Sequence, residues 1–208
     1  MSSDPLAGSR QAIVVLTDDY DTTRGMLQRY EREAGGAWRA MGGRVAVVVG
    51  RKGLAAEGAK REGDGKAPGG IYSLGSAFGF AESAPQLRVP YRQLLDTTEC
   101  VDDTASRYYN QIVDRDAVAI VDWKSSEKMR AVPVYRWGMV VNYNTPPVPQ
   151  RGSCIFLHIW NGPSSSTAGC TAMPVEDLEE VLRWLDPAAK PRLVQFTKRE
   201  YAAMRGLP

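Results

Sequence analysis

The sequence contains a single histidine, His158, among its 208 residues. It also contains only three cysteines, Cys100, Cys154 and Cys170, and they are widely separated. Metal sites built from these residue types need several ligands at short, regular spacing. The sequence therefore predicts no bound metal, and no motif in it indicates a cofactor.

The chain also lacks a strong excess of one charge and any long apolar run. Its 26 basic and 24 acidic residues are interleaved and leave a net charge of +2. This balance gives no basis for a nucleic-acid partner. No apolar run approaches the roughly 20 residues that cross a bilayer. The hydrophobic share of 43% argues against disorder, and we expect one domain over residues 1–208.

Short β-branched and apolar runs dominate the pattern, and Gly, Pro, Asn and Asp separate them. The runs lie at Ala12–Leu16, Arg44–Val49, Trp137–Tyr143, Cys154–Ile159 and Arg192–Phe196. They predict a mostly β protein with a few helices. Residues Met26–Arg32 are ambiguous, because their composition also suits a helix.

Two helices are expected. Pro174 is suited to the first position of a helix, and Leu178, Val181, Leu182 and Leu185 follow at helical spacing. Pro187 would end this helix. A second, shorter helix is predicted at Tyr108–Val113.

The segment that joins His158 to Cys170 carries the clearest chemical signal. His158 lies at the end of a run that reads as a buried strand, and a loop of turn-forming residues leads to Gly169 and Cys170. A cysteine becomes a nucleophile when a nearby base takes its proton. The helix expected after Cys170 would also favour a thiolate at its positive end. A buried core histidine and a buried core cysteine remain the alternative interpretation.

Two motifs resemble those of the YkuD-type L,D-transpeptidases, the cysteine enzymes that cross-link bacterial peptidoglycan. One is His158 followed by Thr167-Ala168-Gly169-Cys170, where the family usually has Ser-His-Gly-Cys. The other is Lys60–Tyr72, KREGDGKAPGGIY, which is similar to the family pattern K-x-G-D-x-x-[ST]-P-x-G-x-[FY]. The resemblance spans about residues 45–196 and is that of a divergent branch.

The resemblance implies a β-sandwich or barrel of mixed sheets, in which the cysteine loop is followed by a helix. It makes residues 26–32 one arm of a hairpin that turns near Gly35-Gly36. It also implies that Cys170 is the nucleophile and His158 its base, that the carbonyl of Ile159 orients the imidazole, and that the Gly169 N–H stabilises the oxyanion.

The resemblance further implies a peptidoglycan L,D-transpeptidase that joins stem peptides through 3–3 or 1–3 links. The alternatives are a hydrolase on the same site (an L,D-carboxypeptidase or an endopeptidase/amidase) and a non-catalytic wall-binding module. The partners would be donor and acceptor stem peptides. Candidate substrate-binding residues, for which packing or turn formation is the competing role, are Trp160, Asn161, Ser166, Thr167, Tyr72, Asn142 and Tyr143.

The sequence departs from the family pattern at two positions. Ile159 follows the histidine where many members have Gly, and Ala172 stands where many have an Arg that holds a substrate carboxylate. Arg130 and Arg136 are the possible replacements. The resemblance therefore supports the family's cysteine chemistry in this chain better than it supports the family's donor and acceptor preferences.

Peptidoglycan chemistry implies the periplasm or another part of the bacterial cell envelope. The start, Met1–Pro5, does not resemble an export signal, so we expect that such a segment is missing from this chain. In an oxidising compartment Cys100 and Cys154 are free to pair. The alternative is that Cys154 is only a core residue.

Overall fold

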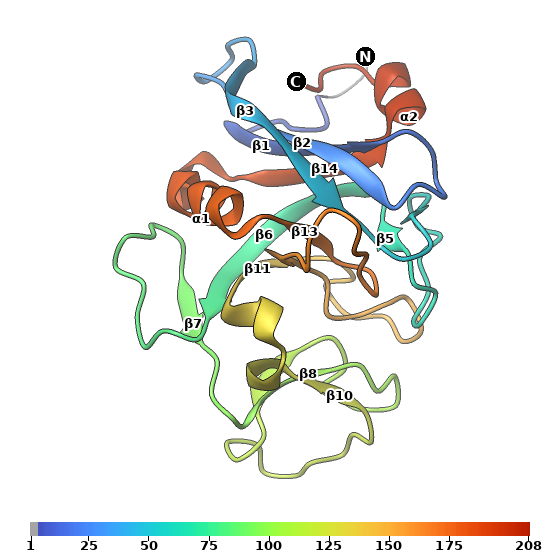
Figure 1. Cartoon of the computed structure of the whole chain (residues 1–208), viewed down its shortest axis with the longest axis vertical. Coiled ribbons are helices and arrows are strands. Elements are labelled where there is room, and N and C mark those ends of the chain that lie inside the picture. The colour runs from blue at the N-terminus through green and yellow to red at the C-terminus, as the bar shows by residue number, and fades with distance from the viewer. Residues whose placement is uncertain (1–3) are drawn as a thin grey trace.

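The computed structural model describes residues 4–208, and strands are its main component (Figure 1). Residues 1–3 lie outside the described residues. They include most of Met1–Pro5, the segment that does not resemble an export signal. The strands are β1 Gln11–Thr17, β2 Arg24–Glu31, β3 Arg39–Val48, β4 Leu54–Ala55, β5 Ala67–Pro68, β6 Gly70–Gly79, β7 Tyr91–Gln93, β8 Thr98–Val101, β9 Ile112–Asp114, β10 Ser126–Lys128, β11 Trp137–Val141, β12 Phe156–Ile159, β13 Thr171–Met173 and β14 Arg192–Thr197. The helices are α1 Val175–Trp184 and α2 Lys198–Ala203, with 3-10 turns η1 Met129–Ala131, η2 Pro133–Arg136 and η3 Pro187–Ala189.

The main sheet has nine strands in the order β11-β12-β13-β3-β2-β1-β14-β6-β7. Strand β11 also pairs with β6, so the sheet curls back on itself and becomes barrel-like. Parallel pairs, such as β1 with β14 and β12 with β13, stand beside antiparallel ones. The predicted fold, mostly β with mixed sheets, is confirmed.

The ambiguous segment at residues 26–32 lies mostly in strand β2, as the family resemblance implied. Strand β2 pairs antiparallel with β3, with Leu27 opposite Val45 and Tyr30 opposite Ala40. Residues 32–38 form the turn that contains Gly35-Gly36. The helical composition of the segment is overridden because Leu27 is fully buried within the sheet.

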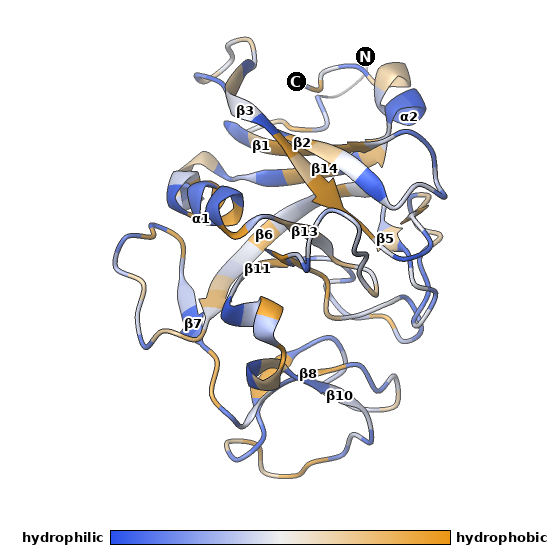
Figure 2. Cartoon of the chain, viewed as in Figure 1, coloured by the Kyte–Doolittle hydropathy of each residue, from blue (hydrophilic) through white to orange (hydrophobic). Residues whose placement is uncertain are grey.

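Helix α1 covers one side of the sheet with the predicted face. Leu178, Val181, Leu182 and Leu185 are all buried in the largest hydrophobic cluster. In Figure 2 this helix is mostly hydrophilic, with hydrophobic residues where it adjoins the sheet. Pro174 is the N-cap residue, and the helix ends at Trp184, before Pro187. Within residues 4–208, no helix combines the length and the apolar character that crossing a membrane requires.

Residues 94–136, which we call the small-sheet segment, leave the main sheet and form a three-stranded sheet of order β10-β8-β9. It lies at the bottom of Figure 1. The short helix predicted at residues 108–113 is wrong. Asn110 has a φ of 61°, outside the helical region, and β9 begins at Ile112. The Asn110 amide stabilises this turn by donating to the carbonyls of Tyr143 and Asn144.

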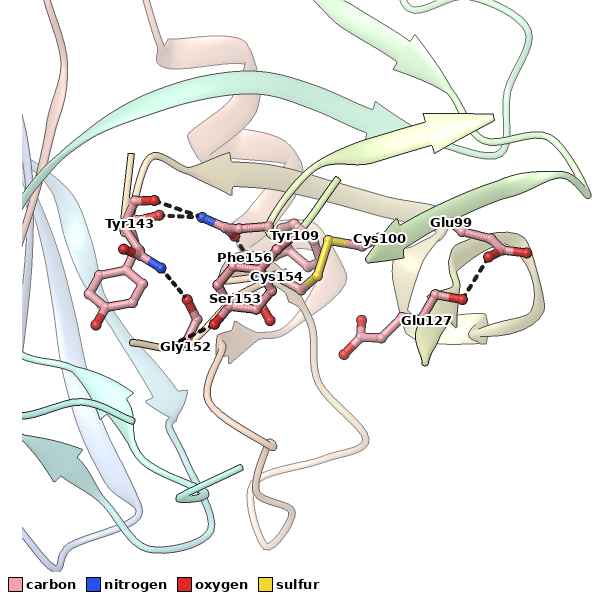
Figure 3. Close-up of a disulfide and its surroundings, with 12 residues drawn as sticks. Glu99, Cys100, Tyr109, Glu127, Tyr143, Gly152, Ser153, Cys154 and Phe156 are labelled. Carbon is pink, nitrogen blue, oxygen red and sulfur yellow. Dashed lines mark hydrogen bonds between the residues drawn. A yellow bond between two sulfur atoms is a disulfide. The ribbon is translucent and has the colours of Figure 1, made fainter. Parts of the chain in front are cut away.

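A disulfide between Cys100 and Cys154 ties the small-sheet segment to the main sheet (Figure 3). Cys100 lies in β8, and Cys154 lies two residues before β12. Both sulfurs are also part of a buried cluster that includes Phe156. The pairing that the sequence left open is therefore present, and it positions the small-sheet segment next to the strand that carries His158.

Candidate active site

Strands β12 and β13 bring the candidate base and nucleophile together. They pair in parallel, with His158 opposite Ala172, and Cys170 directly precedes β13. Because side chains alternate along a strand, Cys170 projects to the same side as Ala172 and His158. Only 7% of His158 and 5% of Cys170 are exposed, and both line one cavity.

The hydrogen bond of His158 selects one tautomer of the imidazole. Nδ1 lies 2.7 Å from the carbonyl oxygen of Ile159, and a carbonyl only accepts, so Nδ1 carries the hydrogen. Burial lowers the pKa of His158 to about 4, although the Ile159 carbonyl partly opposes this shift. The ring is therefore neutral at pH 7, and Nε2 keeps a lone pair that can take a proton.

Cys170 is a neutral thiol in this structure, contrary to the thiolate that the sequence suggested. Burial, and next the charge of Glu127, raise the pKa of Cys170 to about 12. The Phe156 N–H donates to Sγ at 3.3 Å, and Sγ donates to the Cys154 carbonyl at 3.4 Å. Strand β13 separates Cys170 from the start of α1, so the helix end does not offset the cost of burying the charge.

The cavity around this pair has a volume of about 340 Å³, and charged side chains of both signs line it. Its ionisable side chains besides His158, Cys170 and Tyr135 are Arg51, Lys60, Glu62, Asp102 and Glu127. They come from three separate parts of the chain: residues 51–62, the turn that follows β8, and strand β10. A lining with both signs of charge suits a substrate that also carries both.

The Lys60–Tyr72 motif builds one wall of the cavity. Lys60 is almost fully buried, and its Nζ lies 2.6 Å from Asp64 Oδ1. Asp64 also accepts the backbone N–H groups of Arg61 and Lys66. Burial alone would raise the pKa of Asp64, but the hydrogen bond from Lys60 and those from the backbone hold it below its ordinary value. The lysine and the aspartate of the motif thus stabilise its turn.

Tyr135 is a site residue that the sequence analysis missed. It lies in η2, and its ring packs edge-on against the His158 ring, with centroids 5.3 Å apart. Its hydroxyl donates to Glu127 Oε2 at 2.7 Å. Burial, then the nearby Cys170 and Glu127, raise the pKa of Tyr135 well above its ordinary value. No spacing or motif distinguishes Tyr135 or Glu127 in the sequence, because both reach the cavity only through the fold of the small-sheet segment.

Several predicted residues do line the cavity, namely Asn161, Ser166, Thr167 and Gly169. The oxyanion role expected for Gly169 meets an obstacle. The Gly169 N–H donates to Thr167 Oγ1 at 3.1 Å, and that hydroxyl in turn donates to the Cys170 carbonyl at 2.6 Å. Thr167 therefore braces the cysteine loop, and the Gly169 N–H is already engaged.

The other predicted substrate-binding residues lie outside this cavity. Trp160 lines a separate depression with Met26. Tyr72 donates to the Gly69 carbonyl and packs edge-on against Tyr143, with centroids 5.5 Å apart. Tyr143 donates to the Arg151 carbonyl, and Asn142 donates to Ser73 Oγ. These contacts are of the kind expected for packing and turn formation, the competing role of Tyr72, Asn142 and Tyr143.

The two arginines suggested as substitutes for the missing one also lie outside this cavity. Ala172 is fully buried. Arg130 stacks over the Phe80 ring at 4.0 Å, and neither Arg130 nor Arg136 lines the cavity. The basic side chains that do line it are Arg51 and Lys60. Within residues 4–208, no three His, Cys, Asp or Glu side chains gather closely enough to hold a metal ion.

Comparison with known proteins agrees with this geometry. The family model for YkuD, described as the L,D-transpeptidase catalytic domain, matches residues 19–194. The matched range contains both motifs, His158, Cys170 and the whole small-sheet segment. No curated protein matches the chain.

Proposed function

The chain belongs to the YkuD family of L,D-transpeptidase catalytic domains, and from that premise we propose that it is a peptidoglycan L,D-transpeptidase. It would be a cysteine acyltransferase that cross-links stem peptides, through 3–3 or 1–3 links, by way of a thioester on Cys170. The observation that carries this proposal is the shared cavity of His158 and Cys170, in which the imidazole is neutral and its Nε2 is unprotonated.

The first half of the reaction forms the thioester. Nε2 of His158 takes the Sγ proton as Sγ bonds to the carbonyl carbon of an L-residue in the donor stem. The tetrahedral intermediate collapses, the bond to the following D-residue breaks, and the leaving amine takes the proton from Nε2. His158 is then neutral again, and the acyl group is on Cys170.

The second half transfers the acyl group to an amine of a second stem. The amine nitrogen bonds to the thioester carbon, the C–S bond breaks, and Cys170 regains its proton by way of His158. One backbone donor to the oxyanion is worth about 3 kcal/mol. The Gly169 N–H can supply it only after exchanging its bond to Thr167.

Residues 1–208 would act as one catalytic domain on donor and acceptor stems in the periplasm or another part of the cell envelope. The Cys100–Cys154 disulfide supports that location, because such bonds persist in oxidising compartments. The thiol that remains, Cys170, is buried, which protects the nucleophile from pairing with other thiols.

Purified peptidoglycan fragments with tetrapeptide stems test the proposal. We expect mass spectrometry to show cross-linked dimers with the wild type and none with Cys170→Ala. Shortened stems without dimers would instead identify a hydrolase on the same site. Binding to peptidoglycan without any product, and without a thioester, would identify a wall-binding module and overturn the proposal.

A further inference from the structure

Three acidic side chains line the cavity, namely Glu62, Asp102 and Glu127. They lie close enough that the charges of Asp102 and Glu62 both act on Glu127, and we call these three residues the acidic end. Strand β10 carries Glu127, and its partner in the β10–β8 pairing is Cys100. The Cys100–Cys154 disulfide therefore fixes Glu127 relative to the chain that leads to His158, and in Figure 3 the Glu127 side chain extends to the side where Ser153 and Cys154 lie.

Glu127 is the member of the acidic end best suited to exchange a proton. Its Oε2 accepts the Tyr135 hydroxyl, and Oε1 has no donor within residues 4–208. Burial raises the pKa of Glu127, the Tyr135 hydrogen bond opposes that shift, and the charges of Asp102 and Glu62 add to it. Glu62 differs, because it already accepts the hydroxyls of Tyr109 at 2.5 Å and Ser153 at 2.7 Å.

Asp102 is the third member of the acidic end, and one of its carboxylate oxygens is unpartnered in the described part of the chain. This oxygen, Oδ1, is fully buried. A buried carboxylate oxygen without a donor is costly, and native proteins rarely keep one. Asp102 lines the same cavity as Glu127, but its Oδ1 is covered in this structure, so a bound N–H donor would meet this oxygen only after the carboxylate turns toward the cavity.

We propose that the acidic end binds the ammonium group of the acyl acceptor and that Glu127 takes the proton this group loses before it attacks. The inference rests on the proposed function, since it concerns how the thioester on Cys170 is resolved. An aliphatic amine is protonated at neutral pH, and the ammonium form has no lone pair for attack.

The proton count requires a second proton acceptor besides the Cys170 sulfur, which is the role proposed for Glu127. An ammonium that becomes an amide loses two protons: one before the C–N bond forms and one as the tetrahedral intermediate collapses. His158 relays the second proton to Cys170 Sγ as the C–S bond breaks. Glu127 takes the first and releases it to solvent. A negatively charged subsite also binds a cationic acceptor in preference to water. Attack of the amine on the thioester is then favoured over hydrolysis.

The partition of the thioester between amine and water tests this inference, because the ratio does not depend on how fast the thioester forms. The probe is a stem fragment with a free side-chain amine. We expect Glu127→Gln to lower the ratio of amide to hydrolysis product at least tenfold, and Glu127→Asp to restore part of it. Hydroxylamine, which is already neutral at pH 7, should be captured as well by Glu127→Gln as by wild type.

Asp102 gives a second readout. We expect Asp102→Asn to raise the KM for the amine several-fold with a smaller change in kcat. Glu82→Gln and Asp116→Asn are the matched controls, because both side chains are exposed and neither lines the cavity. These two variants should behave like wild type in every assay.

The outcomes separate this inference from the proposed function. A normal partition ratio in Glu127→Gln together with a normal amine KM in Asp102→Asn would overturn the inference and leave the transpeptidase proposal standing. An equal loss of amine and hydroxylamine capture would also overturn it, since a merely structural role has that signature. If wild type forms no thioester with any stem donor, both proposals fail.

Discussion

The carbonyl oxygen of Ile159 lies 2.7 Å from Nδ1 of His158, the residue directly before it. This contact places the imidazole hydrogen on Nδ1 and leaves Nε2 as the acceptor. A carboxylate performs the corresponding task in many triads, but here a neutral backbone group does so. A neutral partner does not favour the imidazolium as a carboxylate would, and burial lowers the pKa of His158 to about 4.

We predict that His158→Gln slows acylation of Cys170 by about a hundred- to ten-thousand-fold, the range typical of a general base. The chain has no other histidine, so no second imidazole can substitute. Stopped-flow mass measurement of thioester formation checks this. A near wild-type rate in the variant would remove His158 from the mechanism.

The low pKa of His158 should be visible in the pH profile of acylation. The imidazole stays neutral, and so remains a base, down to about pH 4. We therefore expect the acid limb of the acylation rate near pH 4, well below the ordinary histidine value of 6.5. An acid limb near 6.5 would show that the imidazole is better solvated than its burial indicates.

The same shift predicts a pH-dependent stability. Between pH 6.5 and about 4 the unfolded chain binds a proton at His158 and the folded chain does not. The free energy of unfolding therefore falls as pH falls through this window, by at most about 3 kcal/mol from this residue. Urea unfolding of wild type and His158→Gln measures it: the difference between the two proteins should change across the window and be constant above it.

The His158–Cys170 pair could be predicted from sequence because both residues lie in one short segment. A buried strand, a loop and a second strand confine the two side chains to neighbouring positions on one face. The helix face of Leu178, Val181 and Leu182 was predictable for the same reason, since its periodicity is local.

The remainder of the site depends on contacts between distant parts of the chain. Tyr135 and Glu127 reach the cavity through η2, β10 and the disulfide, and no local pattern encodes that path. The helix expected at residues 108–113 failed because the side chain of Asn110 bonds to residues 143 and 144, a contact that composition cannot reveal. The hairpin at residues 24–48 needed the family resemblance to override its helical composition.

Cys170 should react slowly with alkylating agents at neutral pH. Only the thiolate is reactive, and burial raises the pKa of Cys170 to about 12. We predict labelling by iodoacetamide at pH 7 at least about a hundredfold slower than in the unfolded chain, with a rate that still rises above pH 9. Cys170→Ala is the control and should not be labelled, because Cys100 and Cys154 are joined. Labelling of native wild type at the rate of the unfolded chain would show that the thiolate is stabilised after all.

Removing the disulfide should destabilise the protein and slow catalysis. The bond links residues 54 positions apart, and the chain-entropy account assigns about 4 kcal/mol to a loop of that length. We predict that Cys100→Ser with Cys154→Ser lowers the free energy of unfolding by up to that amount.

The double variant should also lower kcat below the melting transition, because the small-sheet segment carries Tyr135 and Glu127 into the cavity. Thermal unfolding and initial rates on the same samples separate the two effects. Unchanged kcat in the folded double variant would mean that the main sheet alone holds the segment in place.

Carbapenems, the β-lactams to which the family is generally susceptible, should acylate Cys170. The strained lactam carbonyl replaces the stem carbonyl as the electrophile: the Sγ–C bond forms, the lactam C–N bond breaks, and the ring nitrogen takes its proton from His158. Because Ala172 stands where many members have an arginine, we expect a slower reaction than in those members. Intact-protein mass spectrometry should show a gain of one carbapenem in wild type and none in Cys170→Ala. An equal gain in both would mean that another group reacts.

Arg51 lines the cavity and is the basic side chain that we expect to hold the drug carboxylate. Arg51→Gln should therefore slow acylation by the carbapenem several-fold. The pH at which the acid limb of the acylation rate lies should stay unchanged, because that limb belongs to His158.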